Sequence, residues 1–156
     1  MDNMRRTIFF NSGKISGEVS ADHTFLCNFF PCEFVENGVA YRTVEHYFQS
    51  KKYNDPEIIR VILNARTPKQ AKSLTRNYPI DFVWWGAVRE SVMKAALNLK
   101  FTQNPELLQK LLDTHNAILK EYSKSDLFWG GSLPNSSNKL GLLLMEVRSE
   151  LANKSN

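Results

Sequence analysis

The stretch RTVEHYFQSKKY, residues 42–53, carries a carboxylate, an amide and an amine at helical spacing. Glu45 and Gln49 are four residues apart and Lys52 follows three later, so a helix would place all three along one stripe. The helix rises about 10.5 Å between Glu45 and Lys52. That separation is too long for a simple salt bridge, yet a small ligand between the two charges could touch both. The alternative is structural, because end charges of this kind also match the helix dipole.

A second candidate site lies in the stretch SDLFWGGSLPNSSNKLG, residues 125–141. Asp126 precedes aromatic residues and two glycines, an arrangement that can hold a carboxylate beside a flat apolar wall and can serve a general acid. In this interpretation Trp129, Gly130 and Asn138 contact the substrate. The alternatives are again structural: Asp126 caps a turn, Trp129 anchors the core and Asn138 caps the next helix.

Aromatic and basic residues give further candidates for binding. Trp84 and Trp85 are neighbours at the head of a long helix and point in different directions, so one can be core while the other stacks on a base. Arg76 and Arg89 can hold phosphate through the guanidinium fork, with solvated surface arginine as the alternative. His46 has no partnered Ser or Cys nucleophile in a recognisable setting, so we do not take it as catalytic.

Length and composition fit one globular domain over residues 1–156, with an ordered core of about 7–151. No apolar run approaches the ~18 residues of a membrane helix, and the N-terminus does not resemble a signal peptide. We therefore expect a cytoplasmic protein with no membrane partner. The net charge of +4 suits an anionic partner such as a phosphate ester, a nucleotide or a nucleic acid.

Cysteine and histidine usage predicts neither a disulfide nor a metal site. Cys27 and Cys32 are the only cysteines, too few for a disulfide framework. The three histidines do not pair with them in any metal-ligand spacing. Neither a Walker loop nor a GxGxxG motif is present. We expect buried thiols, no metal and no cofactor.

The hydrophobic pattern predicts a mainly α, α-rich α+β fold, a single compact helical domain with a small N-terminal β-hairpin element. Asn37-Gly38 marks the hairpin turn, because both positions tolerate positive φ. Thr43 is expected to cap a helix that runs to about Asn54. The remaining helices are expected at residues 56–65, 68–77, 84–103, 105–115 and 140–151, with a fraying tail after them.

Four stretches, in the order in which they occur, resemble the NADAR, or YbiA-like, family. They cover nearly the whole chain from Phe25 to Leu151. The most specific pieces are EHYFQ, VM-x5-LKF, and LGLLLMEVR after a D-x-x-WGG loop. The four stretches are FLCNFFPCEFVENGVAYRTVEHYFQSKKY, ARTPKQAKSLTRN, WWGAVRESVMKAALNLKFTQNPELLQKLLDT and SDLFWGGSLPNSSNKLGLLLMEVRSEL.

The resemblance implies an α-rich fold that hydrolyses a ribosyl C1′–N bond. The implied substrates are small phosphorylated ribosyl compounds, the phosphoribosylamino-pyrimidine intermediates of riboflavin biosynthesis, with release of ribose 5-phosphate. An alternative is removal of ADP-ribose from guanine bases, free or in ADP-ribosylated nucleic acid. The third hypothesis, a non-enzymatic ADP-ribose or nucleotide-binding module, is disfavoured because Glu45, Trp85 and Asp126 are all present.

Local alignment with the family motifs places its functional positions on Glu45, Trp85 and Asp126. Cleavage of a ribosyl C–N bond builds positive charge at C1′, so Glu45 and Asp126 would divide charge stabilisation and protonation of the leaving nitrogen, in an order that the sequence leaves open. Lys52 is the amine that can instead attack C1′ of a ring-opened aminal to form a Schiff base. Trp85 would stack on the base, and Arg76 would take phosphate.

Overall fold

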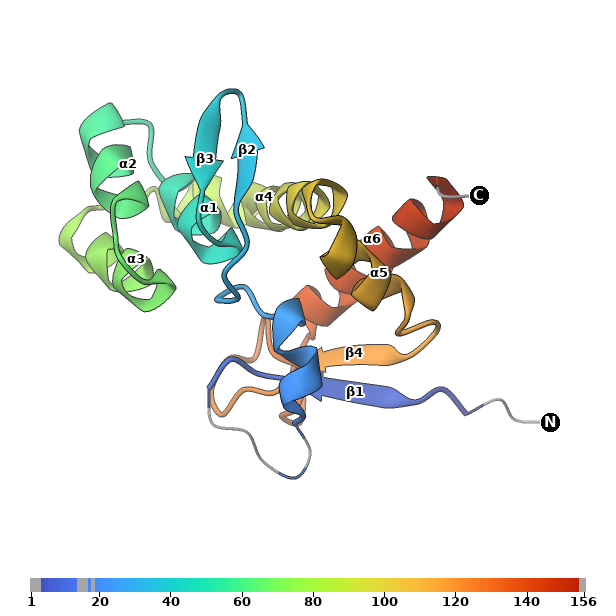
Figure 1. The fold of residues 1–156 in the computed structure, drawn as a ribbon. Coiled ribbons are helices and arrows are strands. Elements are labelled where there is room, and N and C mark those ends of the chain that lie inside the picture. The colour runs from blue at the N-terminus through green and yellow to red at the C-terminus, as the bar shows by residue number, and fades with distance from the viewer. Residues whose placement is uncertain (1–3, 14–16, 18, 155–156) are drawn as a thin grey trace. The chain divides into compact units, whose positions relative to one another are not determined.

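A computed structural model gives the fold of the chain (Figure 1). It describes residues 4–13, 17 and 19–154. Helices provide most of the regular structure, and the strands are short. The predicted fold class, α-rich with a small N-terminal hairpin, is therefore confirmed. Within the described ranges no helix is both long enough and apolar enough to cross a membrane.

The chain divides into two compact units. The terminal unit joins residues 1–27 to residues 105–156, and the central unit is formed by residues 28–104. Glu45, Lys52 and the other candidates of the first stretch belong to the central unit, whereas Asp126 and its loop belong to the terminal unit. The expectation of one domain over the whole chain stays a prediction.

The central unit begins with the predicted hairpin. Strand β2 (Phe34–Glu36) pairs antiparallel with β3 (Val39–Tyr41). The two turn residues between them, Asn37 and Gly38, have φ angles of 52° and 79°. Positive φ at both positions is the signature of a type I′ turn, so this local prediction is confirmed.

Helix α1 (Val44–Ser50) follows the hairpin at once and is the helix that the others surround. The Thr43 side chain accepts a hydrogen bond from the His46 backbone N–H, so the predicted cap is confirmed. The helix ends at Ser50 rather than at Asn54. It stops there because Tyr53 turns into the core, where its hydroxyl donates to the backbone carbonyls of Thr75 and Tyr78.

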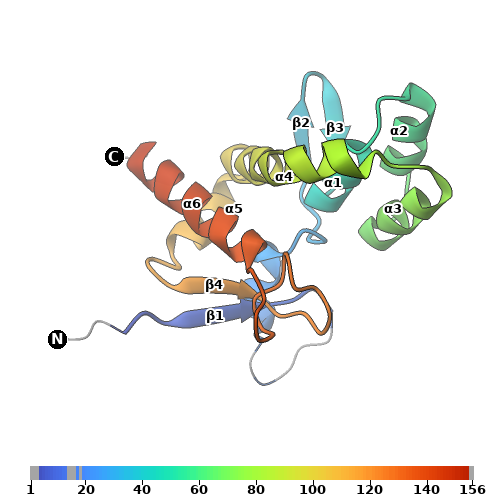
Figure 2. The same ribbon diagram turned by 180° about the vertical axis from the view of Figure 1, so that it is seen from behind.

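Each later α-helix of the central unit starts at an aspartate or threonine cap. Figure 2 shows α4 running beside α1, and α1 also contacts α2 and α3. The helix predicted over residues 68–77 is divided, because its last turn tightens into the 3-10 helix η2. The elements are α2 (Pro56–Leu63, capped by Asp55), α3 (Pro68–Leu74, capped by Thr67), η2 (Thr75–Asn77) and α4 (Phe82–Gln103, capped by Asp81).

The terminal unit is built on a parallel pair of strands that the sequence pattern did not predict. Strand β1 (Thr7–Phe10) pairs with β4 (Ile118–Glu121), so that segments from opposite ends of the chain lie side by side (Figure 1). The other elements are the 3-10 helix η1 (Ala21–Leu26), α5 (Pro105–Leu112) and α6 (Lys139–Lys154). Helix α5 is shorter than expected. The tail expected to fray is helical to Lys154, and residues 155–156 lie outside the described ranges.

Helix α6 packs against β4 at a glycine. A Cβ built on Gly141 would lie 1.9 Å from the Leu119 carbonyl oxygen and 2.6 Å from the Asn138 side chain. Leu119, Leu140 and Leu144 around this contact are fully buried. The absence of a side chain at Gly141 is therefore what lets the helix approach the strand.

We expect Gly141→Ala to lower the free energy of unfolding by about 2 kcal/mol or more, because the methyl group meets backbone that has no room to move. Gly86→Ala is the matched control: it lies inside α4, and a Cβ there meets nothing within 4 Å. That change should stabilise the protein by about 0.5–1 kcal/mol, since alanine is the better helix former. Chemical denaturation measures both. Equal effects of the two substitutions would contradict this account of the α6–β4 contact.

Candidate functional site

Helix α1 is buried on every side. All seven of its residues are buried, including the polar Glu45, His46, Gln49 and Ser50. The stripe of Glu45 and Gln49, which resembles a solvated helix face in the sequence, is thus inside the protein. Buried polar groups need partners within the fold, so the partners of each side chain show what the helix does.

The Glu45 carboxyl is the central group of this helix. Its side chain is only 6% exposed, and its Oε1 accepts a 2.7 Å hydrogen bond from the Gln49 side-chain N–H. Burial raises the pKa of Glu45 above its usual value, against the opposing effects of the Gln49 hydrogen bond and of the positive charges on Lys72 and Lys52. A buried carboxyl with a raised pKa can hold and release a proton nearer to neutral pH.

Two residues that are hydrogen-bonded to Glu45 each carry a buried side-chain oxygen with no hydrogen-bond partner among the described residues. One is the Oε1 of Gln49, whose side chain is only 2% exposed, and the other is the Oδ1 of Asn28. The backbone carbonyl of Asn28 accepts a hydrogen bond from the Glu45 backbone N–H, so Asn28 lies at the start of α1. Buried acceptors without donors are costly, and a ligand with hydroxyl groups would satisfy them.

Lys51 and Lys52 have different surroundings. The Lys51 ammonium lies 2.9 Å from the Glu36 carboxylate, and the Tyr47 hydroxyl donates to the same carboxylate. The Lys52 ammonium lies 5.7 Å from the ring centroids of both Phe48 and Trp85. Lys52 is therefore the lysine beside Phe48 and Trp85, whereas Lys51 lies beside Tyr47 and pairs with Glu36.

The pKa of Lys52 is lowered, chiefly because burial disfavours the ammonium form; the Glu45 carboxylate opposes this shift and Lys72 reinforces it. A lysine with a lowered pKa has more of its neutral amine near neutral pH, and the neutral amine is the nucleophile in Schiff-base chemistry. The structure thus brings together Glu45, Gln49 and Lys52, three groups that the helical stripe predicted to share a face.

Trp85 and Phe48 form the aromatic wall next to Lys52. Their ring centroids are 4.9 Å apart with planes inclined at 60°. Trp85 is 6% exposed, whereas its neighbour Trp84 is 39% exposed and its centroid lies 5.9 Å from that of Trp85. The two tryptophans thus divide as expected, one into the core and one toward the surface, and the buried one is beside the amine.

One basic residue near Glu45 and Lys52, Lys72, was not among the candidates from the sequence. Lys72 on α3 is exposed, yet its charge acts on both Glu45 and Lys52. Arg76, the predicted phosphate ligand, is exposed on η2, and its side chain makes no hydrogen bond or ion pair with any described residue. No sequence signal marks Lys72, because only the packing of α3 against α1 brings it near the site.

Asp126 caps a turn in the terminal unit, as the structural alternative predicted. Its Oδ1 accepts hydrogen bonds from the backbone N–H groups of Phe128 and Trp129 at 3.0 and 2.9 Å. Its own N–H donates to the Ser123 hydroxyl. The carboxylate is half-buried and holds the first turn of the loop, so its visible role is to shape the loop.

Gly130 and Asn138 also serve the packing of this loop. A Cβ on Gly130, which is buried, would lie 2.5 Å from the Asp126 carbonyl oxygen and 2.8 Å from Ser123. Gly130 therefore allows the loop to close on itself at this point. Asn138 donates through its side-chain amide to the Leu119 carbonyl, and its backbone carbonyl accepts the first α6 bond, from Leu142.

Trp129 is half-buried, and its ring packs edge-on against Phe128 with centroids 4.8 Å apart. The expectation that Trp129, Gly130 and Asn138 contact a substrate stays a prediction.

His46 and the cysteines are structural. The His46 Nε2 lies 3.0 Å from the Ala65 carbonyl and its Nδ1 lies 2.8 Å from the Thr43 hydroxyl oxygen. Burial lowers the pKa of His46, so the neutral ring donates to Ala65 and accepts from Thr43. Cys27 and Cys32 are both buried, as expected, and burial raises the pKa of the Cys32 thiol.

The fold, the buried Glu45 and Gln49 and the half-buried Lys52 define the class of protein, an α-rich domain with an acid and an amine beside aromatic rings. A family model described as the NADAR domain matches residues 9–152. The chain belongs to the NADAR family. The solved NMR structure of the Escherichia coli protein YbiA is similar, with a TM-score of 0.82 and 35% identity, covering 97% of this chain and 89% of that one.

Curated relatives agree with this assignment. The chain is 37% identical over 136 residues to the N-glycosidase YbiA of Escherichia coli, covering 85% of this chain and 84% of YbiA. It is 38% identical over 139 residues to a riboflavin biosynthesis protein of Vibrio vulnificus, covering 86% of this chain but only 37% of that protein. A chloroplastic riboflavin biosynthesis protein of Zea mays is 36% identical over 130 residues, 74% of this chain and 21% of its own length.

The relatives named N-glycosidase confirm the predicted class of enzyme, a hydrolase of N-glycosyl bonds.

The raised pKa of Glu45 predicts how stability depends on pH. Above the usual pKa of 4.5 the folded state holds more protons on this carboxyl than the unfolded chain does, so its contribution lowers the free energy of unfolding as pH rises through the folded pKa. We therefore expect Glu45→Gln to be more stable than the wild type at pH 7. Its free energy of unfolding should also fall less steeply than that of the wild type as pH rises. Glu33→Gln, at an exposed position of the same unit, is the control and should follow the wild-type profile. Urea denaturation from pH 4 to pH 8 measures the effect. A Glu45→Gln protein less stable than wild type at pH 7 would contradict it.

Proposed function

We propose that this chain hydrolyses the ribosyl C1′–N bond of phosphoribosylamino-pyrimidine intermediates of riboflavin biosynthesis and releases ribose 5-phosphate. The observation that carries the proposal is the buried Glu45 carboxyl near the Lys52 amine, with the Trp85 and Phe48 rings beside that amine. The names of relatives, N-glycosidase and riboflavin biosynthesis protein, support the reaction and the substrate class. The proposed location is the cytoplasm.

Glu45 is proposed as the general acid. As the C1′–N bond breaks, its electron pair goes to the leaving nitrogen, which takes the proton of the Glu45 carboxyl. Water adds to the oxocarbenium-like C1′ and gives a proton to the Glu45 carboxylate, which restores the acid. The raised pKa suits this cycle, because both proton transfers need a carboxyl that can be neutral and charged in turn.

Lys52 offers a second route through a covalent intermediate. Its neutral amine adds to C1′ of the ring-opened substrate, the pyrimidine amine leaves with a proton, and a Schiff base between Lys52 and the sugar remains. Water then hydrolyses the Schiff base, releasing the sugar phosphate and the free amine. The lowered pKa of Lys52 supports this route, and the nearby Glu45 can supply and accept the protons.

Substrate binding is proposed to use the groups around these two. The Trp85 ring would stack on the pyrimidine, with Phe48 behind it. A ribose hydroxyl would donate to Gln49 Oε1, the buried acceptor without a partner among the described residues. Lys72 would attract the phosphate, alone or together with Arg76. For Asp126 we propose that it orders the WGG loop through its two backbone hydrogen bonds, and its catalytic role, implied by the family motif, stays a prediction.

We expect the purified protein to release ribose 5-phosphate from phosphoribosylamino-pyrimidine intermediates, and Glu45→Gln to lower kcat/KM by at least about 100-fold, because the amide cannot donate and recover a proton. Glu33→Gln should keep full activity. Chromatography of the freed base measures turnover, with ADP-ribosylated guanosine as a parallel substrate. Cleavage of that substrate alone would replace the proposal with guanine de-ADP-ribosylation. Binding without cleavage of either would indicate a nucleotide-binding module.

Borohydride reduction separates the two routes. If Lys52 forms a Schiff base, reduction during turnover should add a ribosyl phosphate to the chain, and peptide mass spectrometry should locate it on Lys52. Lys52→Arg should abolish the adduct, whereas Lys51→Arg should keep it, because Lys51 is held by Glu36. Turnover without an adduct in the wild type would leave direct hydrolysis as the mechanism.

A further inference from the structure

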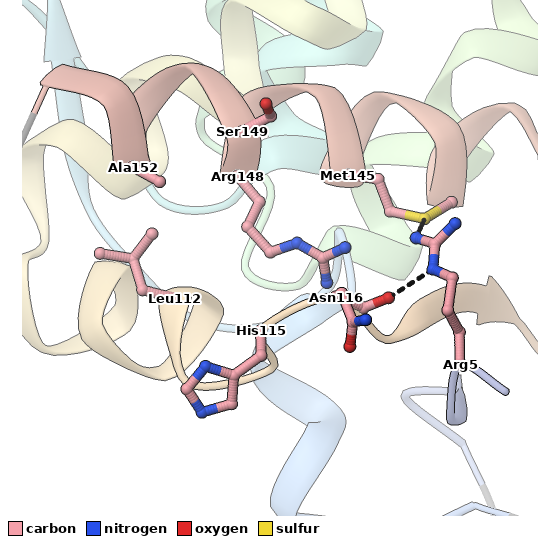
Figure 3. Close-up of a pocket in the computed structure, with 8 residues that line it drawn as sticks. All are labelled: Arg5, Leu112, His115, Asn116, Met145, Arg148, Ser149 and Ala152. Atoms are coloured by element: carbon pink, nitrogen blue, oxygen red, sulfur yellow. Dashed lines mark hydrogen bonds between the residues drawn. The ribbon is translucent and has the colours of Figure 1, made fainter. Parts of the chain in front are cut away.

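A cavity of about 560 Å³ lies entirely within the terminal unit, formed by residues that the proposed function does not use (Figure 3). Its walls come from the segment before β1, from the turn between α5 and β4, and from one face of α6. The face of α6 is formed by Met145, Arg148, Ser149 and Ala152, which recur at helical spacing. Two arginines, Arg5 and Arg148, lie on its wall together with the imidazole of His115.

Arg148 is a buried cation held by neutral partners. It is only 7% exposed. Its two terminal nitrogens donate to the Thr114 hydroxyl at 2.8 Å and to the Ala117 carbonyl at 2.9 Å. These bonds fix the plane of the guanidinium and leave further N–H groups of the same fork for a ligand. A charge this deeply buried ordinarily has a counter-charge.

Arg5 approaches from the other wall. Its Nε donates to the backbone carbonyl of Asn116 at 2.7 Å, and one terminal nitrogen lies 3.9 Å from the Met145 sulfur. Figure 3 shows the guanidinium groups of Arg5 and Arg148 on either side of Asn116. Both arginines are therefore anchored by neutral oxygen atoms at the same part of the cavity.

No carboxylate balances these two charges within the described part of the chain. Neither arginine takes part in an ion pair there, and no acidic residue lines the cavity. Glu146 and Glu150 of α6 are not on the cavity face, and Asp113 accepts from the Gln109 side chain instead. Burial lowers the pKa of Arg148, and the like charge of Arg5 lowers it further, so the two cations repel each other.

We propose that this cavity binds the phosphate group of a small phosphate monoester, held between the guanidinium groups of Arg5 and Arg148. An anion between the two forks removes their repulsion and gains charge-assisted hydrogen bonds from both. The two positive charges match a phosphate monoester, which carries about −1.5 to −2 at pH 7, better than a single carboxylate.

The size and lining of the cavity indicate what the phosphate is attached to. A volume of about 560 Å³ exceeds the need of an inorganic ion and is in the range of small-molecule sites. Leu112, Met145 and Ala152 form its apolar wall, which suits a ring or other apolar portion. The Asn116 side chain supplies polar groups nearby. The expected ligand is therefore a nucleoside monophosphate or a phosphate ester of similar size.

Titration of the 15N-labelled full chain tests the proposal, with inorganic phosphate, adenosine 5′-monophosphate and adenosine as probes. We expect both phosphate-bearing probes to shift the backbone amide signals of Asn116 and Ser149 and the Nε–H signals of the two arginines. Adenosine should leave these signals unchanged. Equal shifts with adenosine, or none with either phosphate probe, would overturn the proposal.

Variants assign the binding to the cavity. Arg5→Gln should weaken adenosine monophosphate binding at these signals at least about tenfold, since a charge-assisted bond is lost. Arg6→Gln is the matched control: it removes the same charge one residue away, where the side chain lines a different hollow. Arg148→Lys tests the planar fork, with thermal unfolding to verify folding. Arg5 is exposed, so its variant gives a result even if Arg148→Lys unfolds.

Trp85→Ala separates this site from the proposed catalytic one. The shifts at Asn116 and Ser149 should persist in that variant, because none of the cavity residues belongs to α1 or α4. Shifts that Trp85→Ala abolishes and Arg5→Gln leaves intact would overturn the second site. Failure of the N-glycosidase assay with intact binding in the cavity would refute only the proposed function.

Discussion

Burial of helix α1 on every side is the constraint on which the candidate site depends. A helix without a solvated face must satisfy all its polar side chains from within the fold. His46 does so through Thr43 and Ala65, and Ser50 donates to the Tyr47 carbonyl. Glu45 and Gln49 satisfy each other only in part, since the side-chain oxygen of Gln49 is left without a donor among the described residues. A ligand with a hydrogen-bond donor could satisfy this oxygen and so complete the polar network.

The same burial sets the chemistry of both ionisable groups on the helix. Desolvation raises the pKa of the Glu45 carboxyl and lowers that of the Lys52 amine, so each moves toward neutrality. Their mutual attraction and the Lys72 charge modify these shifts without reversing them. An acid and an amine poised in this way cost stability in the free protein. The apolar contacts of α1 with its neighbours, Phe48 on Trp85 and Tyr47 among Phe34 and Tyr41, offset that cost.

What the sequence predicted well was determined by local interactions. The helix starts at Thr43 and Asp55 follow from side-chain caps, and the Asn37-Gly38 turn follows from backbone conformation. Glu45 and Gln49 share a face because both lie in α1, whereas Lys52 lies in the turn just after the helix ends. The β1–β4 pairing was missed because a parallel pair between distant segments leaves no turn signal in the sequence. Lys72 was missed because its effect on Glu45 arises from the packing of α3 against α1, and the spacing of residues in the sequence does not show which helices pack together.

The two carboxyls that the family motifs mark, Glu45 and Asp126, differ in their burial and in their hydrogen-bond partners. Glu45 has a single side-chain amide as partner and is deeply buried, so its protonation state is sensitive to the site and suits proton transfer. Asp126 binds two backbone N–H groups through one oxygen and holds a turn whose glycines are too crowded for any side chain. The geometry of the loop alone is therefore enough to explain the D-x-x-WGG motif. Catalysis at Asp126 stays a prediction, because its two backbone hydrogen bonds already account for its place in the loop. At Glu45, by contrast, the carboxyl is buried with only the Gln49 amide as hydrogen-bond partner, which is the arrangement that supports the proposed proton transfer.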